Sequence, residues 1–205
     1  MPQNSVPAIV IGRLPLYLRM LTFLELEGKT ITASQELAER LGFSSAQIRK
    51  DLSYFGEFGK QGTGYNIAYL QKQLRQILKI DRTWEMALIG AGDLGHALAN
   101  YRGFGAQNFR IAAAFDNAPE KIGARLGDLT VQSMDELPSV LHERKIQIAM
   151  LAVPADVAQA VAGQLVELGI RAVLNYAPIT LSLPPKVKVY YIDPVVGLQS
   201  MTYYL

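Results

Sequence analysis

The sequence predicts an α/β protein with an N-terminal winged helix-turn-helix domain followed by a Rossmann-type, doubly wound parallel sheet. Three observations predict this fold. Two short capped helices with a tight turn between them precede a glycine-rich hairpin in the N-terminal third. A G-x-G-x-x-G motif beginning at Gly90 follows an apolar strand and opens a helix. Strands and helices then alternate, which is typical of a parallel sheet with helices on both faces.

Composition narrows the classes of function. Half of the 205 residues are hydrophobic, and no apolar run reaches the roughly 18 to 20 residues that a membrane span requires. The chain has no cysteine, so disulfides, thiolate nucleophiles and cysteine metal sites are excluded. We therefore expect a cytoplasmic protein without a signal peptide, a membrane partner or a metal, in which any redox sensing comes through a bound molecule.

Charge is distributed unequally along the chain. Residues 1–80 contain ten basic and six acidic residues, whereas the remainder contains ten basic and twelve acidic residues. A basic first part beside a mildly acidic body indicates a polyanionic partner for the first part only. The expected domains are a DNA-binding domain at 1–80, a dinucleotide-binding domain at 81–195 and a C-terminal helix at 196–205.

Helical periodicity and capping patterns predict the helix-turn-helix motif. Apolar residues recur at helical spacing in residues 13–27, where Pro15 suits a first turn. Thr32 begins a capping-box pattern for a second helix, and Ser44 begins another for a third. A tight turn after Gly42 separates these two short helices, which is the spacing of a helix-turn-helix motif.

The third helix is expected to have two faces. Ile48, Leu52 and Phe55 fall together and should pack on the preceding helices. The opposite face offers cations, hydroxyl groups and a small residue, which can contact guanine edges and phosphates. A solvated helix face is the alternative, but the capped helix and tight turn before it favour DNA. The face consists of Ala46, Arg49, Lys50, Ser53 and Tyr54.

A hairpin follows this helix. Three glycines within residues 59–64 predict a tight turn, with Lys60 and Gln61 at its tip. Such a tip can enter a minor groove, whereas a plain surface turn is the alternative. A hairpin directly after a recognition-type helix is a winged-helix arrangement, which favours the first interpretation. An amphipathic helix at residues 68–80 closes the domain.

The glycine-rich loop predicts a nucleotide site. Gly90 permits the tight turn, Gly92 lets the backbone approach a pyrophosphate, and Gly95 lets the helix pack on the strand. The N–H groups and positive dipole end of the helix then face the phosphates. The loop consists of Gly90, Ala91, Gly92, Asp93, Leu94 and Gly95.

The ends of three later strands complete the expected site. Asp116 ends the second strand, where an acid can bond the adenosine ribose hydroxyls, and Asn117 rather than an arginine follows it, which favours NAD over NADP. A turn-opening role for Asp116 is the alternative. Ligands lie across the carboxyl ends of such sheets. Two strand exits are therefore expected on the nicotinamide side, although each could be purely structural: Val153 and Pro154, and Asn175, Tyr176, Ala177 and Pro178.

The apolar tail, residues 194–205, would expose much hydrophobic surface as a free helix. Packing on a second subunit accounts for it, by exchange between protomers if the helix crosses over, and packing on its own domain is the alternative.

Several strings, in their order along the chain, resemble the Rex family of redox-sensing transcriptional repressors. They are RKDLSYFG, the glycine-rich wing ending in GY, GAGDLGHALANYRGFG, LAVP, LNYAP and the closing ID…GLQS. The resemblance covers nearly the whole chain. It implies a homodimer that exchanges the helix at residues 196–205, binds palindromic operator DNA when NADH is low relative to NAD+, and is released by NADH.

The resemblance also assigns residues. The recognition helix matches residues 45–55, the wing matches Phe58 to Tyr65, and a switch network falls on Arg19, Tyr101 and Asp193. The implied DNA contacts are Ser45, Ala46, Gln47, Arg49, Lys50, Ser53, Tyr54, Lys60, Gln61 and Gly62. This chain departs from the family at two places: Gln61 stands where an arginine is common, and Asp93 places a negative side chain beside the pyrophosphate.

The cofactor is expected to act as an allosteric signal rather than as a reagent. Neither histidine, His96 or His142, is an obvious acid–base catalyst for hydride transfer. A pocket of Tyr101, Pro178 and the partner's apolar tail should favour the neutral ring of NADH over the cationic ring of NAD+. The alternatives are a small NAD-dependent oxidoreductase with a regulatory N-terminal domain, a winged-helix regulator that senses another nucleotide such as CoA, and a scaffold that binds neither ligand.

Overall fold

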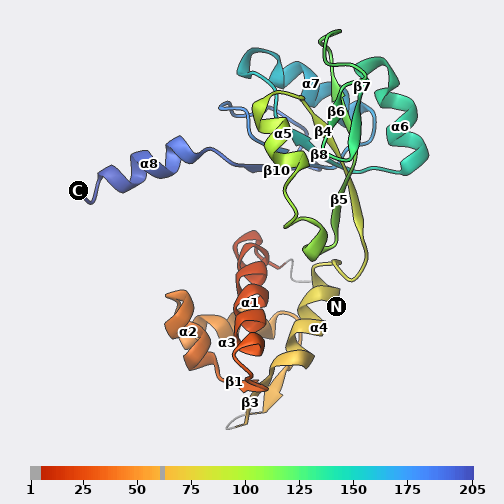
Figure 1. The fold of residues 1–205 in the computed structure, drawn as a ribbon. Helices are drawn as coiled ribbons and strands as arrows, with labels where there is room; N and C mark the ends of the chain where they lie inside the picture. The colour runs from red at the N-terminus through yellow and green to blue at the C-terminus, as the bar shows by residue number, and fades with distance from the viewer. Residues whose placement is uncertain (1–5, 61–62) are drawn as a thin grey trace. The chain divides into compact units, whose positions relative to one another are not determined.

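A computed structural model of the chain describes residues 6–60 and 63–205, which form two compact units (Figure 1). The units divide between Arg82 and Thr83. Within the described ranges, no helix has the length and apolar character that crossing a membrane requires.

Unit 1 is a winged helix-turn-helix domain, as the sequence predicts. Its three short strands form an antiparallel sheet in the order β1-β3-β2, in which β2 and β3 are the predicted hairpin. In chain order, its elements are α1 (Ala8–Leu26), β1 (Ile31–Thr32), α2 (Ser34–Leu41), α3 (Ser45–Ser53), β2 (Gly59–Lys60), β3 (Gly64–Asn66) and α4 (Ile67–Ile77).

Two expected helix starts in unit 1 are wrong. Pro15 lies inside α1, because Val10 is also buried and extends the apolar stripe upstream of the proline. Thr32 does not cap α2: it lies in β1, and its Oγ1 donates to Glu36 Oε2 at 2.7 Å, which leaves Ala33 as an N-cap without a side-chain bond. At α3 the expected cap is confirmed, since Ser44 Oγ accepts from the Gln47 N–H at 3.1 Å.

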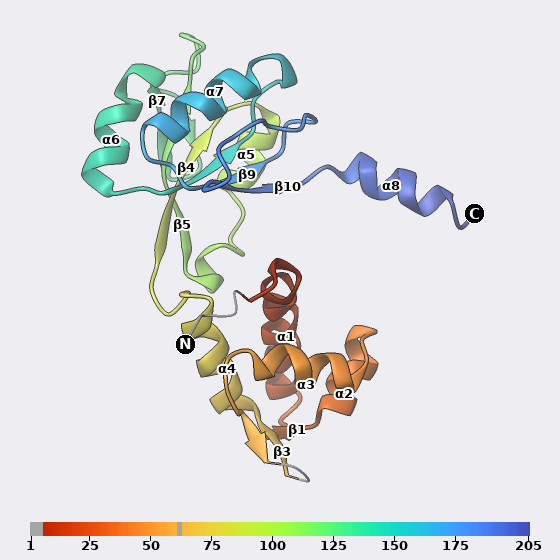
Figure 2. The same cartoon turned by 180° about the vertical axis from the view of Figure 1, so that it is seen from behind.

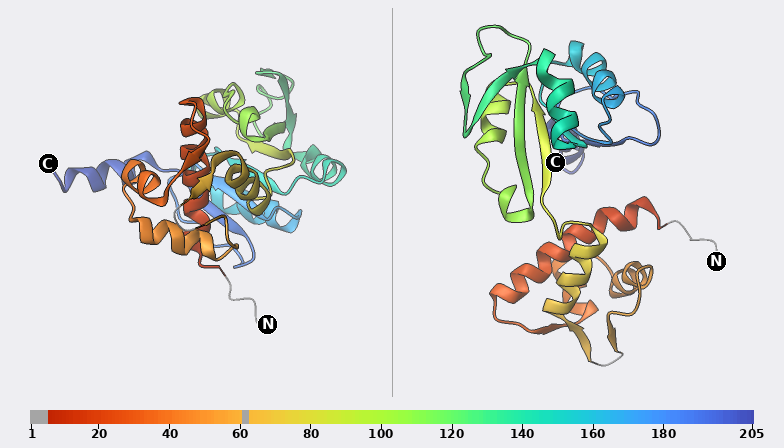
Figure 3. Two further views of the ribbon diagram at one scale, coloured as in Figure 1. Left: turned by 90° about the horizontal axis from the view of Figure 1, so that it is seen from below. Right: turned by 90° about the vertical axis from the view of Figure 1, so that its right-hand side faces the viewer.

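Unit 2 is the predicted doubly wound sheet. Its seven strands follow the order β10-β9-β8-β4-β5-β7-β6, and all neighbours are parallel except β6 and β7. The α6 and α7 helices cover one face of the sheet and α5 covers the other (Figures 2 and 3). The main elements are β4 (Trp84–Ile89), α5 (Asp93–Ala99), β5 (Phe109–Asp116), β6 (Arg125–Leu126), β7 (Leu129–Ser133), α6 (Leu137–Arg144), β8 (Ile148–Leu151), α7 (Ala155–Glu167), β9 (Ala172–Asn175), β10 (Lys188–Tyr191) and α8 (Pro194–Thr202). Two short 3-10 helices, Gly105–Gln107 and Met134–Glu136, complete it.

Side chains along β4 alternate between the two faces of the sheet and so contribute to two layers of core. Ala87 and Ile89 pack with α6 and α7, whereas Met86 and Leu88 pack on the side of α5. A strand buried on both faces places its carboxyl end, where Gly90 follows, between the two helical layers.

The C-terminal helix α8 buries nothing against the rest of the described chain. All of its residues are exposed, although most of them are apolar. Leu198 is 60% exposed and Met201 is 63% exposed. The alternative that this helix packs on its own domain is therefore not seen in the structure.

Candidate functional site

A buried aspartate in unit 1 fixes the orientation of α3. Asp51 is fully buried on the inner face of that helix. Arg13 on α1 donates through Nε to Asp51 Oδ2 at 2.6 Å and through Nη2 to Oδ1 at 2.8 Å. The Tyr17 hydroxyl donates to Oδ2 at 2.6 Å, and Gln47 Nε2 donates to Oδ1 at 2.6 Å. A forked guanidinium on a buried carboxylate is directional, so α3 is held on α1 in one rotation.

The titration of this cluster follows from its contacts. Burial alone would raise the pKa of Asp51, but the hydrogen bonds from Arg13, Tyr17 and Gln47 outweigh it and leave that pKa below its ordinary value. Burial and the carboxylate together raise the pKa of the Tyr17 hydroxyl, which keeps it a donor. Sequence reasoning missed the cluster, although Asp51 falls on the same face as Ile48 and Leu52.

The outward face of α3 is exposed, as the sequence predicts. Arg49 and Lys50 project from it, with the Arg49 Nη1 donating to Ser34 Oγ at 3.0 Å. The Ser53 hydroxyl donates to the Lys50 carbonyl at 2.8 Å. Ala46 and Tyr54 are also exposed, and Ser45 is half-buried.

A hollow of about 450 Å³ separates α3 from the wing strands, and Arg49, Ser53, Gly59 and Tyr65 are among its lining residues. Of the expected wing contacts, Gln61 and Gly62 lie outside the described residues. Lys60 contributes backbone to β2, where it pairs with Gly64. Unit 1 thus presents a cationic helix face next to a hairpin.

In unit 2, neighbouring backbone atoms leave no room for a side chain at two glycines of the loop. Gly90 has φ +101°, and a Cβ there would lie 2.3 Å from the Ala152 carbonyl oxygen. A Cβ on Gly95 would lie 2.1 Å from the Gly90 carbonyl oxygen. A Cβ on Gly92, by contrast, would meet nothing within 4 Å, so its backbone faces open space. This division of roles fits a phosphate-binding loop with one face left bare.

The loop borders a cavity of about 660 Å³ at the carboxyl ends of β4, β5 and β8. This volume lies in the usual range for a small-molecule site. The structure brings together most of the expected residues there: Gly90, Gly92, Asp93, Leu94, Asp116, Val153 and Pro154. Val157 and Val161 of α7 add apolar surface that sequence reasoning did not include.

Other expected cofactor contacts do not border this cavity. Ala91 is buried and Gly95 packs behind the loop. Asn175 is fully buried: its Nδ2 donates to the Ala177 and Ile179 carbonyls, both at 3.0 Å, and its Oδ1 accepts from the Ala177 N–H at 3.0 Å. Asn175 therefore shapes the exit of β9, and neither Ala177 nor Pro178 lines the cavity.

Asp116 is a positioned group. It is 7% exposed, and its Oδ2 accepts from the Ala91 N–H at 2.7 Å and from Lys121 Nζ at 3.1 Å. Its Oδ1 accepts from the Ala118 N–H at 2.9 Å. Burial raises its pKa, but these hydrogen bonds outweigh burial and hold the pKa below the ordinary value. Sequence reasoning missed Lys121, whose place at the cleft depends on how the chain turns after β5.

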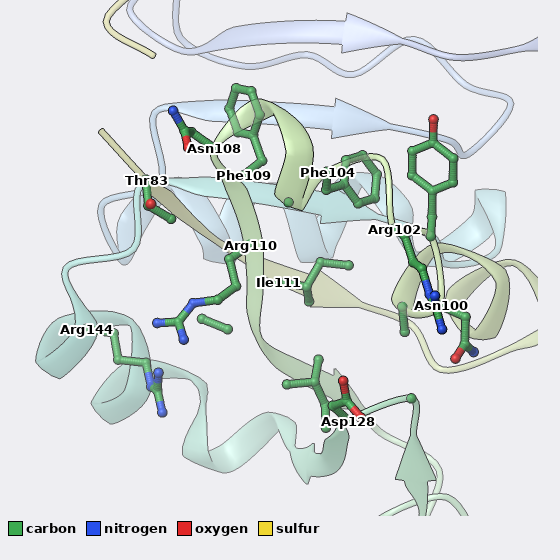
Figure 4. Close-up of a pocket in the computed structure, with 16 residues that line it drawn as sticks. Thr83, Asn100, Arg102, Phe104, Asn108, Phe109, Arg110, Ile111, Asp128 and Arg144 are labelled. Atoms are coloured by element: carbon green, nitrogen blue, oxygen red, sulfur yellow. The ribbon is translucent and has the colours of Figure 1, made fainter. Parts of the chain in front are cut away.

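None of the three expected switch residues is among the described residues that line this cavity. Tyr101 follows the C-terminal end of α5, where its ring packs edge-on against Phe104 with the ring centroids 4.9 Å apart. It borders a second hollow of about 1010 Å³, which Figure 4 shows. Neither Tyr101 nor Pro178 lines the cleft of the single chain, and the nicotinamide pocket expected from them together with the partner's tail stays a prediction. Asp193 Oδ1 accepts from the Val195 N–H at 2.9 Å and caps α8. Arg19 is exposed on α1.

Comparisons with known proteins match both units. Residues 5–53 match a family described as "Putative DNA-binding protein N-terminus", and residues 81–179 match one described as "CoA binding domain". A "Redox-sensing transcriptional repressor Rex" from Chloroflexus aurantiacus is 53% identical over 199 residues, which cover 97% of this chain and 94% of that protein. A protein of the same name from Brevibacillus brevis is 44% identical and covers 98% of each chain.

Solved structures agree with these relatives. The crystal structure of RSP in complex with beta-NAD+ and operator DNA matches with a TM-score of 0.92 at 37% identity, covering 98% of this chain and 93% of that one. RSP in complex with beta-NADH matches with a TM-score of 0.88 at 35% identity, covering 98% and 94%.

Asp51→Ala should lower the free energy of unfolding of unit 1 by about 3 kcal/mol, because it leaves the Arg13 guanidinium without its carboxylate. Urea denaturation followed by circular dichroism would measure this, with exposed Glu39→Ala as the control, expected within about 0.5 kcal/mol of wild type.

The loss of unfolding free energy in Asp51→Ala should also depend on pH. The folded-state pKa of Asp51 is depressed, so its contribution is present above the ordinary carboxyl pKa and disappears as the pH falls through the folded value. Equal stability of variant and wild type near neutral pH would contradict the assigned role of the cluster.

Proposed function

The chain belongs to the Rex family of redox-sensing transcriptional repressors, and on this premise we propose that it binds palindromic operator DNA as a homodimer and is released by NADH. One chain combines a cationic helix, α3, that the Arg13–Asp51 pair ties to α1 with a cleft that the glycine-rich loop borders. This combination carries the proposal. The nucleotide is an allosteric effector, and the DNA-bound form prevails when NADH is low relative to NAD+.

For the DNA, we assign direct contact to the exposed face of α3. Arg49 can donate its fork to a guanine edge, and Lys50 can neutralise a phosphate. Ser45, Ala46, Ser53 and Tyr54 would complete the helix contacts, and Gln47 would serve mainly through its bond to Asp51. Lys60, Gln61 and Gly62 remain the proposed minor-groove contacts. Two copies of α3 related by a two-fold axis require two DNA half-sites whose centres are one turn of the duplex, or a multiple of it, apart.

For the cofactor, we assign the pyrophosphate to the bare backbone at Gly92 and the adenosine ribose to the neighbourhood of Asp116. When bound, NAD(H) supplies a ring whose charge depends on its redox state. The cleft is lined by Asp93 and Asp116 as well as by valines, so we place the ring away from both carboxylates, where burying an unpaired cation is costly. This favours the neutral reduced form.

A regulatory role is better supported than an enzymatic one. Neither histidine, His96 on α5 or His142 on α6, is among the described residues that line the cleft, and the named relatives are repressors. The "CoA binding domain" match keeps another nucleotide as the second candidate, while the relatives solved with beta-NAD+ and beta-NADH favour NAD(H). A repressor bound to its operator would act in the cytoplasm.

For assembly, we propose that α8 packs on a second subunit by exchange. An apolar helix that buries nothing in its own chain is unfavourable in water, and a reciprocal exchange buries two such helices at once. Asp193 stands at the start of this helix, so it is placed to transmit a movement of α8. We propose that its charge, together with Arg19 and Tyr101, couples closure around the nucleotide to release of DNA.

The function is tested by a gel-shift titration on DNA from upstream of the chain's own gene. Micromolar NADH should release the DNA, whereas NAD+ at the same concentration should not and should compete with NADH. CoA serves as the comparison ligand. Equal retention of DNA with NADH and NAD+ at matched salt would overturn the proposal, and release by CoA alone would support the second candidate.

The role of α8 is tested by placing charge on its apolar side. The double substitution Leu198→Glu with Met201→Glu should convert the dimer to a monomer in analytical ultracentrifugation. The melting of unit 2 should change little, because these side chains are exposed within their own chain. Ser200→Glu is the control at a polar position of the same helix. A variant that remains dimeric would exclude α8 from the interface.

The switch is tested by Asp193→Asn, which preserves an N-cap acceptor for α8 but removes the charge. We expect operator binding to persist and the NADH concentration for half-release to rise at least tenfold. Asp193→Ala, which removes both the cap and the charge, should raise the NADH concentration for half-release to a similar extent. Wild-type release by NADH in Asp193→Asn would show that the charge plays no part.

A further inference from the structure

Lys121 and Asp116 form an ion pair on the wall of the cleft. The pair joins Lys121 Nζ to Asp116 Oδ2 at 3.1 Å, with the carboxylate 7% exposed and the lysine side chain 39% exposed. Both residues border the cavity. The carboxylate is therefore the buried member of the pair, and the ammonium is the member that a ligand can approach.

The acceptor capacity of Asp116 is largely occupied. Its two oxygens already receive the Ala91 N–H, the Ala118 N–H and the Lys121 ammonium. A carboxylate has about four lone-pair sites, so roughly one remains for a ligand hydroxyl. Lys121 uses one of its three donors in this pair, so the ammonium can serve a further acceptor.

The charges around this position come from few groups. Among the described residues that line the cleft, Lys121 is the sole cation, and Asp93 and Asp116 are the anions. At the carboxyl end of the second strand of such a fold, a ligand presents its adenosine ribose. With Asp116 ionised, Lys121 is neutralised and a dianionic group at the ribose meets no net attraction. Without that negative charge, the same ammonium would attract a phosphate.

We propose that the Lys121–Asp116 ion pair, rather than Asp116 alone, sets the preference of this cleft for a free ribose 2′-hydroxyl over a 2′-phosphate. Asp116 holds the glycine loop through the Ala91 N–H and cancels the charge of Lys121. Lys121 then attracts a phosphate only when the negative charge of Asp116 is removed. This inference rests on the proposed function, because it takes the adenosine of NAD(H) to lie in the cleft.

The experiment compares four full-length proteins: wild type, Asp116→Asn, Lys121→Met and the double variant. The probes are ADP and adenosine 2′,5′-bisphosphate, which differ in where the second phosphate is attached, together with NADH and NADPH. Calorimetry gives each dissociation constant, and a thermal melt reports folding. Glu120→Gln is the matched control, since it removes an exposed negative charge from the same loop without bordering the cavity.

Asp116→Asn should strengthen binding of the 2′-phosphorylated probes, relative to their unphosphorylated counterparts, at least tenfold. Lys121→Met in that background should remove most of the gain, and Glu120→Gln should leave the ratio within about twofold of wild type. If Asp116→Asn does not fold, Lys121→Met alone decides, because it should weaken the 2′-phosphorylated probes relative to ADP and NADH.

The outcomes separate this inference from the proposed function. A wild-type protein that binds neither NADH nor ADP would overturn the proposed function. A wild-type protein that binds NADH, with ratios unchanged in Asp116→Asn and in Lys121→Met, would overturn this inference alone. A gain in Asp116→Asn that survives Lys121→Met would assign the preference to Asp116 without its partner and would likewise overturn it.

Discussion

The buried carboxylate of Asp51 makes the contacts on which the proposed DNA-binding surface depends. Without the fork from Arg13 and the hydroxyl of Tyr17, an ionised group in the core of unit 1 would be strongly destabilising. With them, it ties the inner face of α3 to α1, so that the outer face carrying Arg49 has a defined direction. Asp116 does the same in unit 2, where its hydrogen bond to the Ala91 N–H holds the glycine loop to the end of β5. In both units a buried aspartate positions the element to which we assign ligand contact.

Much of the fold could be predicted because it depends on short-range pattern. The apolar stripe of α1, the Ser44 cap and the Gly42 turn are local features, and the structure contains all three. The glycine loop was predictable for the same reason, since a strand, a turn and a helix follow one another directly. The β6–β7 hairpin was missed because its first strand has two residues and shows no period.

The site residues that escaped prediction are those defined by contacts between distant parts of the chain. Arg13 and Asp51 are 38 positions apart, and no periodic pattern links them. Thr32 looked like a helix cap, but pairing of β1 with β3 placed it in a strand. Tyr101 follows the end of α5 that is far from the loop, and its expected place beside the nicotinamide stays a prediction, because that pocket includes the partner's tail.

The full exposure of α8 leaves its apolar side chains unburied by the described residues of its own chain. If the helix finds its hydrophobic partner only on another copy, dilution favours the dissociated chain by mass action. It follows that a chain with a damaged recognition helix and an intact tail would still form dimers with normal chains. Such a chain would yield mixed pairs with one functional half, so that a defect in a single gene copy would be dominant over the normal one.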